Sequence, residues 1–153
     1  MNILVLNGPN LNLLGTREPD IYGNDTLEDI QKYTEDSLKK MGHEPSLTWK
    51  QFNSEEKMIN AVQETINEKI DALVINPGAF SHTSLALLDA LQSISIPIIE
   101  VHISNTCKRE EIRQRKLTAK AATSIMEGLG KNAYLLGILS LMITGESNGV
   151  SNN

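Results

Sequence analysis

Three short apolar runs, each ending in a cluster of polar and turn-forming residues, constrain the fold of this chain more than any other feature. The runs are residues 3–6, 72–75 and 96–99, and the clusters that follow them are residues 7–12, 76–82 and 100–105. Continuous apolar runs bounded by turn residues are typical of strands buried on both faces, as in a parallel sheet. Since open α/β sheets bind ligands at the carboxyl ends of their strands, the three clusters are predicted to meet at one site.

The remainder of the chain alternates helical and extended patterns. Apolar spacing predicts helices over residues 27–41, 54–66, 84–91, 109–113 and 134–142. Thr26 is the expected N-cap of the first helix, and Gly42 is its expected C′ residue. The second helix is expected to bury one face formed by Met58, Ile59, Val62 and Ile66. Residues 47–52 favour a strand near the sheet edge. The pattern over residues 121–126 fits a helix as well as it fits a fifth strand at 124–126.

Strands that alternate with helices in this way predict an α/β fold. Right-handed crossovers between parallel strands produce a doubly wound three-layer sandwich with a central five-stranded sheet. The chain of 153 residues is long enough for one hydrophobic core, and no linker or repeat divides it. We therefore expect a single domain over residues 1–144, followed by a frayed polar tail over residues 145–153.

Composition excludes several classes of partner. The net charge of -5 and the isoelectric point near 5.2 argue against nucleic acid, which requires a basic surface. No apolar stretch approaches the roughly 20 residues that a membrane span needs, and the N-terminus has no secretory signal pattern. The single cysteine, Cys107, is expected to be a reduced thiol, so the expected location is the cytoplasm.

The end of the predicted strand at 96–101 carries the strongest catalytic candidates. Glu100 and His102 are two residues apart, so their side chains point to the same face of the sheet. A carboxylate beside an imidazole fixes its tautomer, which suits a general acid, although a purely structural Glu–His pair is the alternative. Asn76 and His82 are candidates for ligand contacts, with a simple turn at Asn76 and a helix-capping role for His82 as the alternatives.

The long loop at residues 8–25 contains Arg17 and Tyr22. A guanidinium beside a phenol favours the phenolate, which can act as a base, whereas a loop tyrosine otherwise stacks at the surface. Arg109 and Arg113 lie one helical turn apart, on the same face of a predicted helix. This spacing suits a solvated basic face and a pair of contacts to a ligand anion or hydroxyl equally well. The backbone N–H groups of residues 103–104 are placed to face a carboxylate.

Other functions of this fold lack their defining residues. Residues 8–10 form neither a phosphate-binding Walker loop nor a dinucleotide fingerprint, and they lack the Ser/Thr-rich loop of FMN proteins. Asn7 and Asn76 stand where a receiver domain needs acidic residues. The spacing of histidine, glutamate and cysteine suits no metal site, and Lys50 is the only lysine in a predicted strand. We expect no metal, no cofactor and no Schiff base.

Several motifs together resemble the type II 3-dehydroquinate dehydratases over nearly the whole chain except the tail. They are residues 6–19 with 21–23, residues 76–79 with 82–84, and residues 100–105 with Arg109, Glu110 and Arg113. The resemblance implies a flavodoxin-like fold. It also implies dehydration of 3-dehydroquinate to 3-dehydroshikimate through an enolate, a step of the shikimate pathway, without metal or cofactor.

The resemblance also implies a role for each candidate. Tyr22 is the base, its phenolate favoured by Arg17 and Arg109, and His102, oriented by Glu100, protonates the departing hydroxyl. A water held by residues including Asn10 and Asn76 stabilises the enolate. The groups that hold the substrate are Asn76, His82 and Arg113, the backbone of Ile103 and Ser104, and Asp89 from a neighbouring subunit. The implied assembly is a dodecamer built from trimers.

The chain departs from the family pattern at a few positions. Phe52, Ser54 and Glu56 differ from the usual segment, and Lys116 and Ala133 stand where Ser and Gly are more common. None of these positions carries the implied chemistry, so the departures concern local packing and assembly. The rival function is a non-catalytic module that binds a small molecule or nucleotide, because the fold alone does not distinguish it from an enzyme.

Overall fold

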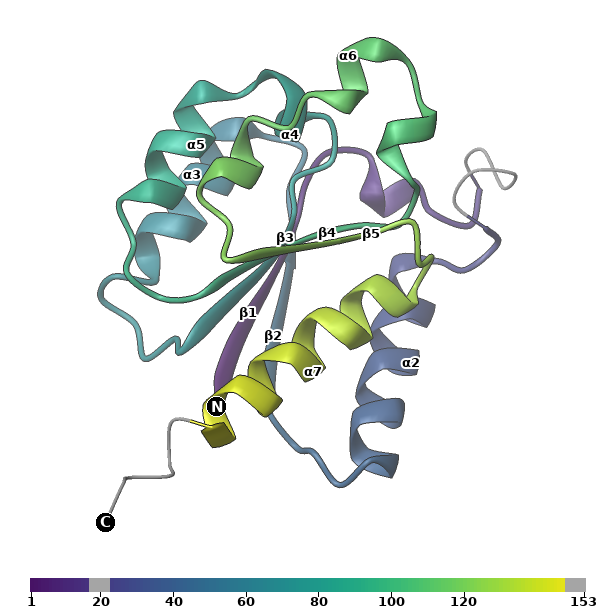
Figure 1. The fold of residues 1–153 in the computed structure, drawn as a ribbon, viewed down its shortest axis with the longest axis vertical. Helices are drawn as coiled ribbons and strands as arrows, with labels where there is room; N and C mark the ends of the chain where they lie inside the picture. Colours follow the sequence, from purple (N-terminus) through teal and green to yellow (C-terminus); the bar gives the residue numbers. More distant parts are fainter. Residues whose placement is uncertain (17–22, 148–153) are drawn as a thin grey trace.

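Five parallel strands form the centre of the molecule, in the order β2-β1-β3-β4-β5 (Figure 1). The computed structural model describes residues 1–16 and 23–147. The strands are β1 (Asn2–Asn7), β2 (Ser46–Gln51), β3 (Ala72–Asn76), β4 (Ile98–His102) and β5 (Ser124–Glu127). The predicted doubly wound α/β fold is confirmed. Residues 124–126, which left strand and helix open, lie in a strand that pairs with β4.

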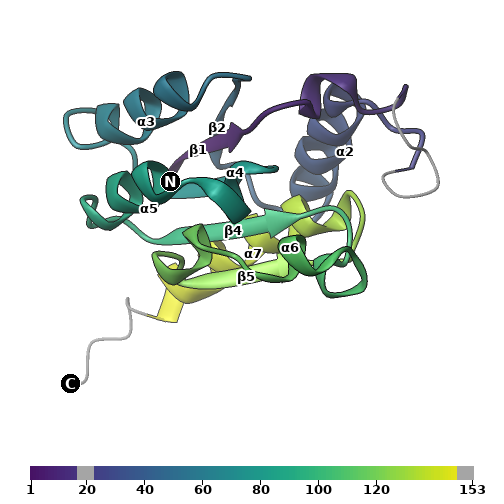
Figure 2. The ribbon, with the colours of Figure 1, turned by 90° about the horizontal axis from the view of Figure 1, so that it is seen from above.

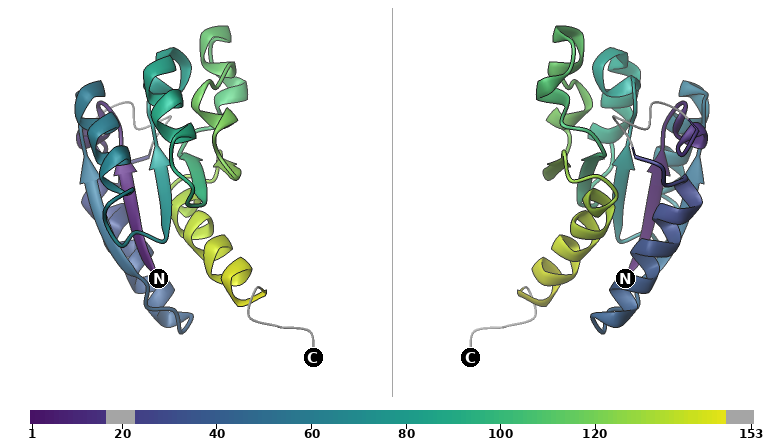
Figure 3. Two further views of the ribbon diagram at one scale, coloured as in Figure 1. Left: turned by 90° about the vertical axis from the view of Figure 1, so that its left-hand side faces the viewer. Right: turned by 90° about the vertical axis from the view of Figure 1, so that its right-hand side faces the viewer.

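Helices cover both faces of the sheet, which is therefore the middle of three layers (Figures 2 and 3). One face packs against α2 (Leu27–Lys40) and α7 (Asn132–Ser147), and the other against α3 (Glu55–Glu64) and α5 (Leu85–Gln92). Shorter helical segments complete the connections: η1 (Leu11–Leu13), α4 (Phe80–Thr83), η2 (Thr106–Lys108), α6 (Glu111–Gln114) and η3 (Thr118–Lys120). In β1, Ile3 and Val5 enter one core while Leu4 and Leu6 enter the other, because successive side chains point to opposite faces.

The ends of α2 are those that the sequence predicts. Thr26 Oγ1 accepts a hydrogen bond from the backbone N–H of Asp29 at 3.1 Å, and Asp29 Oδ2 accepts one from the backbone N–H of Thr26 at 2.9 Å. This reciprocal capping box satisfies two N–H groups that lack partners inside the helix. Gly42 has a φ of 83°, as expected for the residue that ends a helix in the left-handed conformation.

The helix α3 is shorter than predicted, and the prediction that Ile66 lies on its buried face is wrong. The helix ends at Glu64, and Ile66 is 60% exposed. Thr65 closes the last turn by donating from its hydroxyl to the carbonyl of Val62 at 2.7 Å, a local bond that competes with helix continuation. The buried face consists of Met58, Ala61 and Val62.

Other boundaries also differ by a few residues. The strand β2 ends at Gln51, so Phe52 lies outside it. Glu110 has an extended backbone, and α6 therefore begins at Glu111 instead of Arg109. At the C-terminus α7 continues to Ser147, into the segment at 145–153 for which we expected a frayed tail. Residues 148–153 lie outside the described residues.

Candidate active site

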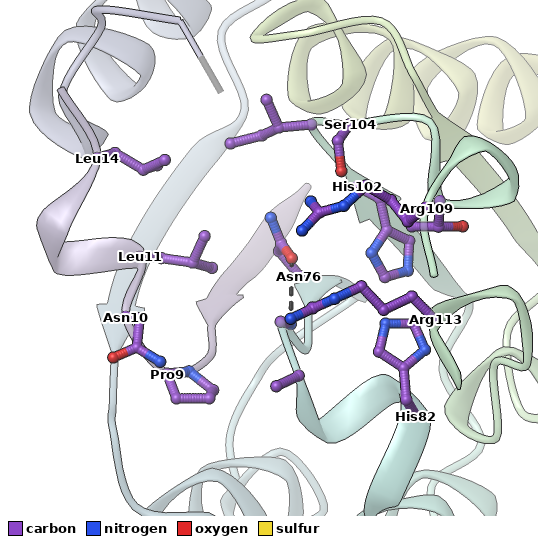
Figure 4. Close-up of a pocket in the computed structure, with 14 residues that line it drawn as sticks. Pro9, Asn10, Leu11, Leu14, Asn76, His82, His102, Ser104, Arg109 and Arg113 are labelled. Atoms are coloured by element: carbon purple, nitrogen blue, oxygen red, sulfur yellow. Dashed lines mark hydrogen bonds between the residues drawn. The ribbon is translucent and has the colours of Figure 1, made fainter. Parts of the chain in front are cut away.

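A pocket lies at the carboxyl ends of the central strands, where the sequence predicts the polar clusters to meet (Figure 4). The predicted site residues that line it are Asn10, Asn76, His82, His102, Ile103, Ser104, Arg109 and Arg113. They come from three segments: the loop after β1, the end of β3 with α4, and the end of β4 with the connection through α6 that follows it. The order of the sheet places these segments side by side, because β1, β3 and β4 are successive neighbours. The three clusters therefore form one site.

His102 is the last residue of β4 and has a carboxylate partner directly beneath it. Its Nε2 lies 2.7 Å from Glu100 Oε1, and the residue is only 5% exposed. The two side chains lie on the same face of the strand, as their spacing predicts. Because Glu100 engages Nε2, the ring nitrogen left for a ligand is Nδ1.

Glu100 is fully buried, so its charge needs partners within the protein. In addition to His102, the hydroxyl of Ser81 donates to Oε1 at 2.9 Å and that of Thr118 donates to Oε2 at 2.7 Å. Three donors thus converge on one carboxylate, which is the arrangement that a buried anion requires. Sequence reasoning missed Ser81 and Thr118, which lie 19 and 18 residues from Glu100 in the chain.

His82 lies beside His102 but has a different partner. The two ring centroids are 6.4 Å apart with an angle of 24° between the planes. Nδ1 of His82 lies 2.8 Å from the carbonyl oxygen of Arg115, which accepts hydrogen bonds only, so Nδ1 carries the proton. Burial lowers the pKa of His82, and the neighbouring His102 and Arg113 lower it further, against the opposing effects of the Arg115 carbonyl and Glu100. The neutral ring offers Nε2 as an acceptor to a ligand hydroxyl.

Asn76 ends β3 and places its amide in the pocket (Figure 4). Its Oδ1 accepts from the backbone N–H of Gly78 at 3.2 Å, and its Nδ2 donates to the hydroxyl of Tyr134 at 2.8 Å. The loop that follows β1 packs at Gly8 against the turn that follows Asn76. A Cβ added to Gly8 would lie 2.3 Å from the carbonyl oxygen of Pro77. A glycine is therefore required at position 8 for the two loops to approach.

The loop that carries Asn10 is held by residues from the end of β2. Asn10 has a left-handed backbone with φ of 66°, and its N–H donates to Asn53 Oδ1 at 2.9 Å. The side chain of Gln51 donates to the carbonyl of Gly8 at 3.1 Å and to Asn53 Oδ1 at 3.0 Å. Gln51 and Asn53 thus support a site residue, a role that the sequence did not indicate.

Two arginines supply positive charge at the edge of the pocket. Arg109 Nε lies 3.4 Å from Glu110 Oε2, and Arg113 Nε lies 3.2 Å from the same oxygen. Their side chains are 14% and 29% exposed, and both line the pocket, as Figure 4 shows. Both arginines already contact the Glu110 carboxylate, so their contact with a ligand anion stays a prediction.

The structure does not bring all predicted site residues into this pocket. Asp89 is an exposed residue of α5 and is not among the residues that line it. Arg17 and Tyr22 lie outside the described residues. Within residues 1–16 and 23–147, no group of three or more His, Cys, Asp or Glu side chains is arranged to hold a metal ion. No helix in that part of the chain is long and apolar enough to cross a membrane.

Comparison with known proteins finds similarity along most of the chain. The model of the family "Dehydroquinase class II" matches residues 1–142. A 3-dehydroquinate dehydratase of Clostridium botulinum is 49% identical over 137 residues, which is 90% of this chain and 91% of that protein. One of Aliarcobacter butzleri is 45% identical over 142 residues, 93% of this chain and 85% of that protein. The crystal structure of a type II dehydroquinase from Butyrivibrio crossotus superposes with a TM-score of 0.88 at 41% identity, covering 93% of this chain and 97% of that one.

Proposed function

The chain belongs to the class II dehydroquinase family, and from this premise we propose that it is a 3-dehydroquinate dehydratase of the shikimate pathway. The reaction converts 3-dehydroquinate to 3-dehydroshikimate and water. A base removes the proton from the carbon beside the ketone, which forms an enolate. The electron pair of the enolate then re-forms the ketone and expels the hydroxyl group of the neighbouring carbon, which leaves as water after protonation. Such chemistry needs a base, an oxyanion stabiliser and a separate acid.

The observation that carries this proposal is the His102–Glu100 pair within a pocket lined by two arginines. His102 is the general acid that protonates the departing hydroxyl through the ring nitrogen not engaged by Glu100. The carboxylate fixes the orientation of the ring and balances the charge of the imidazolium, as orienting carboxylates do in other acid–base pairs. Ser81 and Thr118 hold this carboxylate in place through their hydroxyl groups.

We assign the base to Tyr22, assisted by Arg17, both of which lie outside the described residues. Arg109, which lines the pocket, is the described cation that adds to the stabilisation of the phenolate. A phenol ionises in water only near pH 10, so a base of this kind needs adjacent positive charge.

The other pocket residues bind the substrate and the enolate. Arg113 and the backbone at residues 103–104 face the carboxylate and hydroxyls of the anionic substrate. His82 accepts from a hydroxyl through its unprotonated Nε2, since Nδ1 donates to the Arg115 carbonyl. Asn10 and Asn76 hold the water that stabilises the enolate oxygen.

Assembly completes the proposed site. The family resemblance implies that Asp89 completes the pocket of a neighbouring subunit within a trimer, and its exposed position outside the pocket of its own chain is compatible with that role. Four such trimers form the proposed dodecamer, whose mass is measured by size-exclusion chromatography with light scattering. The enzyme acts in the cytoplasm, where an exposed single thiol such as Cys107 stays reduced. Neither a metal nor an organic cofactor takes part.

The test is turnover of 3-dehydroquinate, followed through the absorbance of the conjugated enone product. The wild type is expected to be active, and chelators or borohydride with substrate are expected to leave its rate unchanged. Tyr22→Phe removes only the hydroxyl, so we expect it to lose nearly all turnover and still bind the substrate. An inactive wild type would support the non-catalytic binding module, and an active Tyr22→Phe variant would rule out that residue as the base.

A further inference from the structure

A buried tyrosine joins the ends of β1 and β3 beneath the pocket. Tyr134, in α7, is fully buried, and its hydroxyl donates to Asn7 Oδ1 at 2.7 Å. The same hydroxyl accepts from Asn76 Nδ2 at 2.8 Å. Asn76 lines the pocket, whereas Asn7 and Tyr134 do not. The tyrosine therefore contacts a site residue from behind.

These bonds can run in one direction only. Asn7 Nδ2 lies 3.3 Å from the backbone carbonyl of Lys50, which only accepts, so Asn7 Oδ1 must face Tyr134. At the other end, the N–H of Gly78 only donates, so it requires Asn76 Oδ1, and Asn76 Nδ2 must face Tyr134. The tyrosine hydroxyl therefore donates its single proton in a hydrogen bond to Asn7 Oδ1. Both ends of this chain of bonds are backbone groups, which cannot exchange donor for acceptor.

The tyrosine is suited to hold these bonds permanently. Burial raises the pKa of its phenol well above the usual range, so the hydroxyl keeps its proton. Its ring packs against Trp49, with centroids 5.5 Å apart and an angle of 35° between the planes. A phenylalanine would keep this ring contact, because it lacks only the hydroxyl. It would leave Asn7 Oδ1 and Asn76 Nδ2 without their buried partner.

We propose that Tyr134 is a positioning residue, which fixes the amide of Asn76 in the one orientation that serves the ligand. The amide then presents its second N–H and the second lone pair of its oxygen to the pocket in a constant arrangement. This inference rests on the proposed function, in which Asn76 holds the water at the enolate oxygen. Because that interaction strengthens as charge develops, misplacement of the amide affects the chemical step more than binding.

The experiment measures steady-state kinetics and thermal unfolding of Tyr134→Phe with 3-dehydroquinate as substrate. We expect kcat to fall about ten- to a hundredfold and KM to change less than about threefold, as for loss of an interaction made in the transition state. A variant with a lowered Tm and the kcat of the wild type would show that Tyr134 only stabilises the fold, and would overturn the proposal.

The chain offers a matched control in Tyr33→Phe. Tyr33 lies in α2, and its hydroxyl donates to Asn132 Oδ1 at 2.8 Å, outside the pocket. Like Tyr134→Phe, this variant removes one phenolic hydroxyl and its hydrogen bond. Because that bond lies outside the pocket, kcat is expected to stay within about twofold of the wild type. An equal loss of kcat in both variants would contradict a specific role for Tyr134.

A second variant covers the case in which Tyr134→Phe does not fold. Asn7→Leu removes the acceptor of the Tyr134 hydroxyl, which then lacks the bond that holds it in place as the acceptor for Asn76 Nδ2. We expect kcat to fall although Asn7 does not line the pocket, and an unchanged kcat would overturn the proposal. An inactive wild type would instead refute the proposed function, whereas an active wild type with unaffected variants would refute the positioning role alone.

Discussion

Two histidines share one pocket, yet their surroundings equip them for different chemistry. His102 contacts a buried carboxylate that two hydroxyls hold in place, whereas His82 contacts a backbone carbonyl. A carboxylate balances the charge of a protonated ring, while a carbonyl fixes the tautomer without supplying a full charge. The ring centroids are only 6.4 Å apart, and both side chains line the same pocket. The partner behind each ring, and not the residue type, therefore distinguishes the two roles that we propose.

The sharpest test of this comparison is to remove each ring in turn. We expect His102→Ala to lower kcat about 100- to 10,000-fold, the usual contribution of a general acid. His82→Ala is expected to act mainly on KM, since in the proposed function the ring accepts a hydrogen bond from the substrate. Initial rates at saturating substrate distinguish the two effects. Comparable losses of kcat in both variants would break the division of roles.

Removal of the charge behind His102 is expected to have a smaller effect. Glu100→Gln keeps the size of the side chain but removes its negative charge. Its amide NH₂ group, a donor, then faces one of the groups that donate to Glu100, namely Ser81, His102 or Thr118. We expect kcat to fall about ten- to a hundredfold, because a hydrogen bond to a charged group contributes about 1.5–3 kcal/mol. Steady-state kinetics measure the loss, and circular dichroism serves as the control for folding. A kcat equal to that of the wild type would mean that the carboxylate does not assist His102.

The smallest expected effect is on the pH dependence of stability through His82. Its pKa is lower in the folded protein than in the unfolded chain, so the unfolded chain binds more protons in that range. The contribution of His82 to the free energy of unfolding is therefore complete above about pH 6.5, the unfolded value, and declines as the pH falls toward the folded value. Urea unfolding of His82→Gln and the wild type at several pH values measures the difference. A wild type that gains stability relative to His82→Gln on acidification would contradict the assignment.

Much of the fold and part of the site geometry follow from local pattern. The apolar runs predicted buried parallel strands, and the two-residue spacing of Glu100 and His102 predicted a shared face, because the strand period is two. Prediction failed at Ile66, where the threonine before it closes the helix. The pattern over residues 124–126 was ambiguous because the segment is short, and pairing with β4 makes it a strand.

The partners that support the site were not predictable in the same way. Tyr134 contacts Asn76 and Asn7 across 58 and 127 residues of chain, and Ser81 and Thr118 reach Glu100 from separate connections. Residue order dictates which backbone segments become strands and where they end, since burial and periodicity act over a few neighbouring residues. Which hydroxyl or amide then meets which buried polar group depends on how distant elements pack, and that information exists only once the chain has folded.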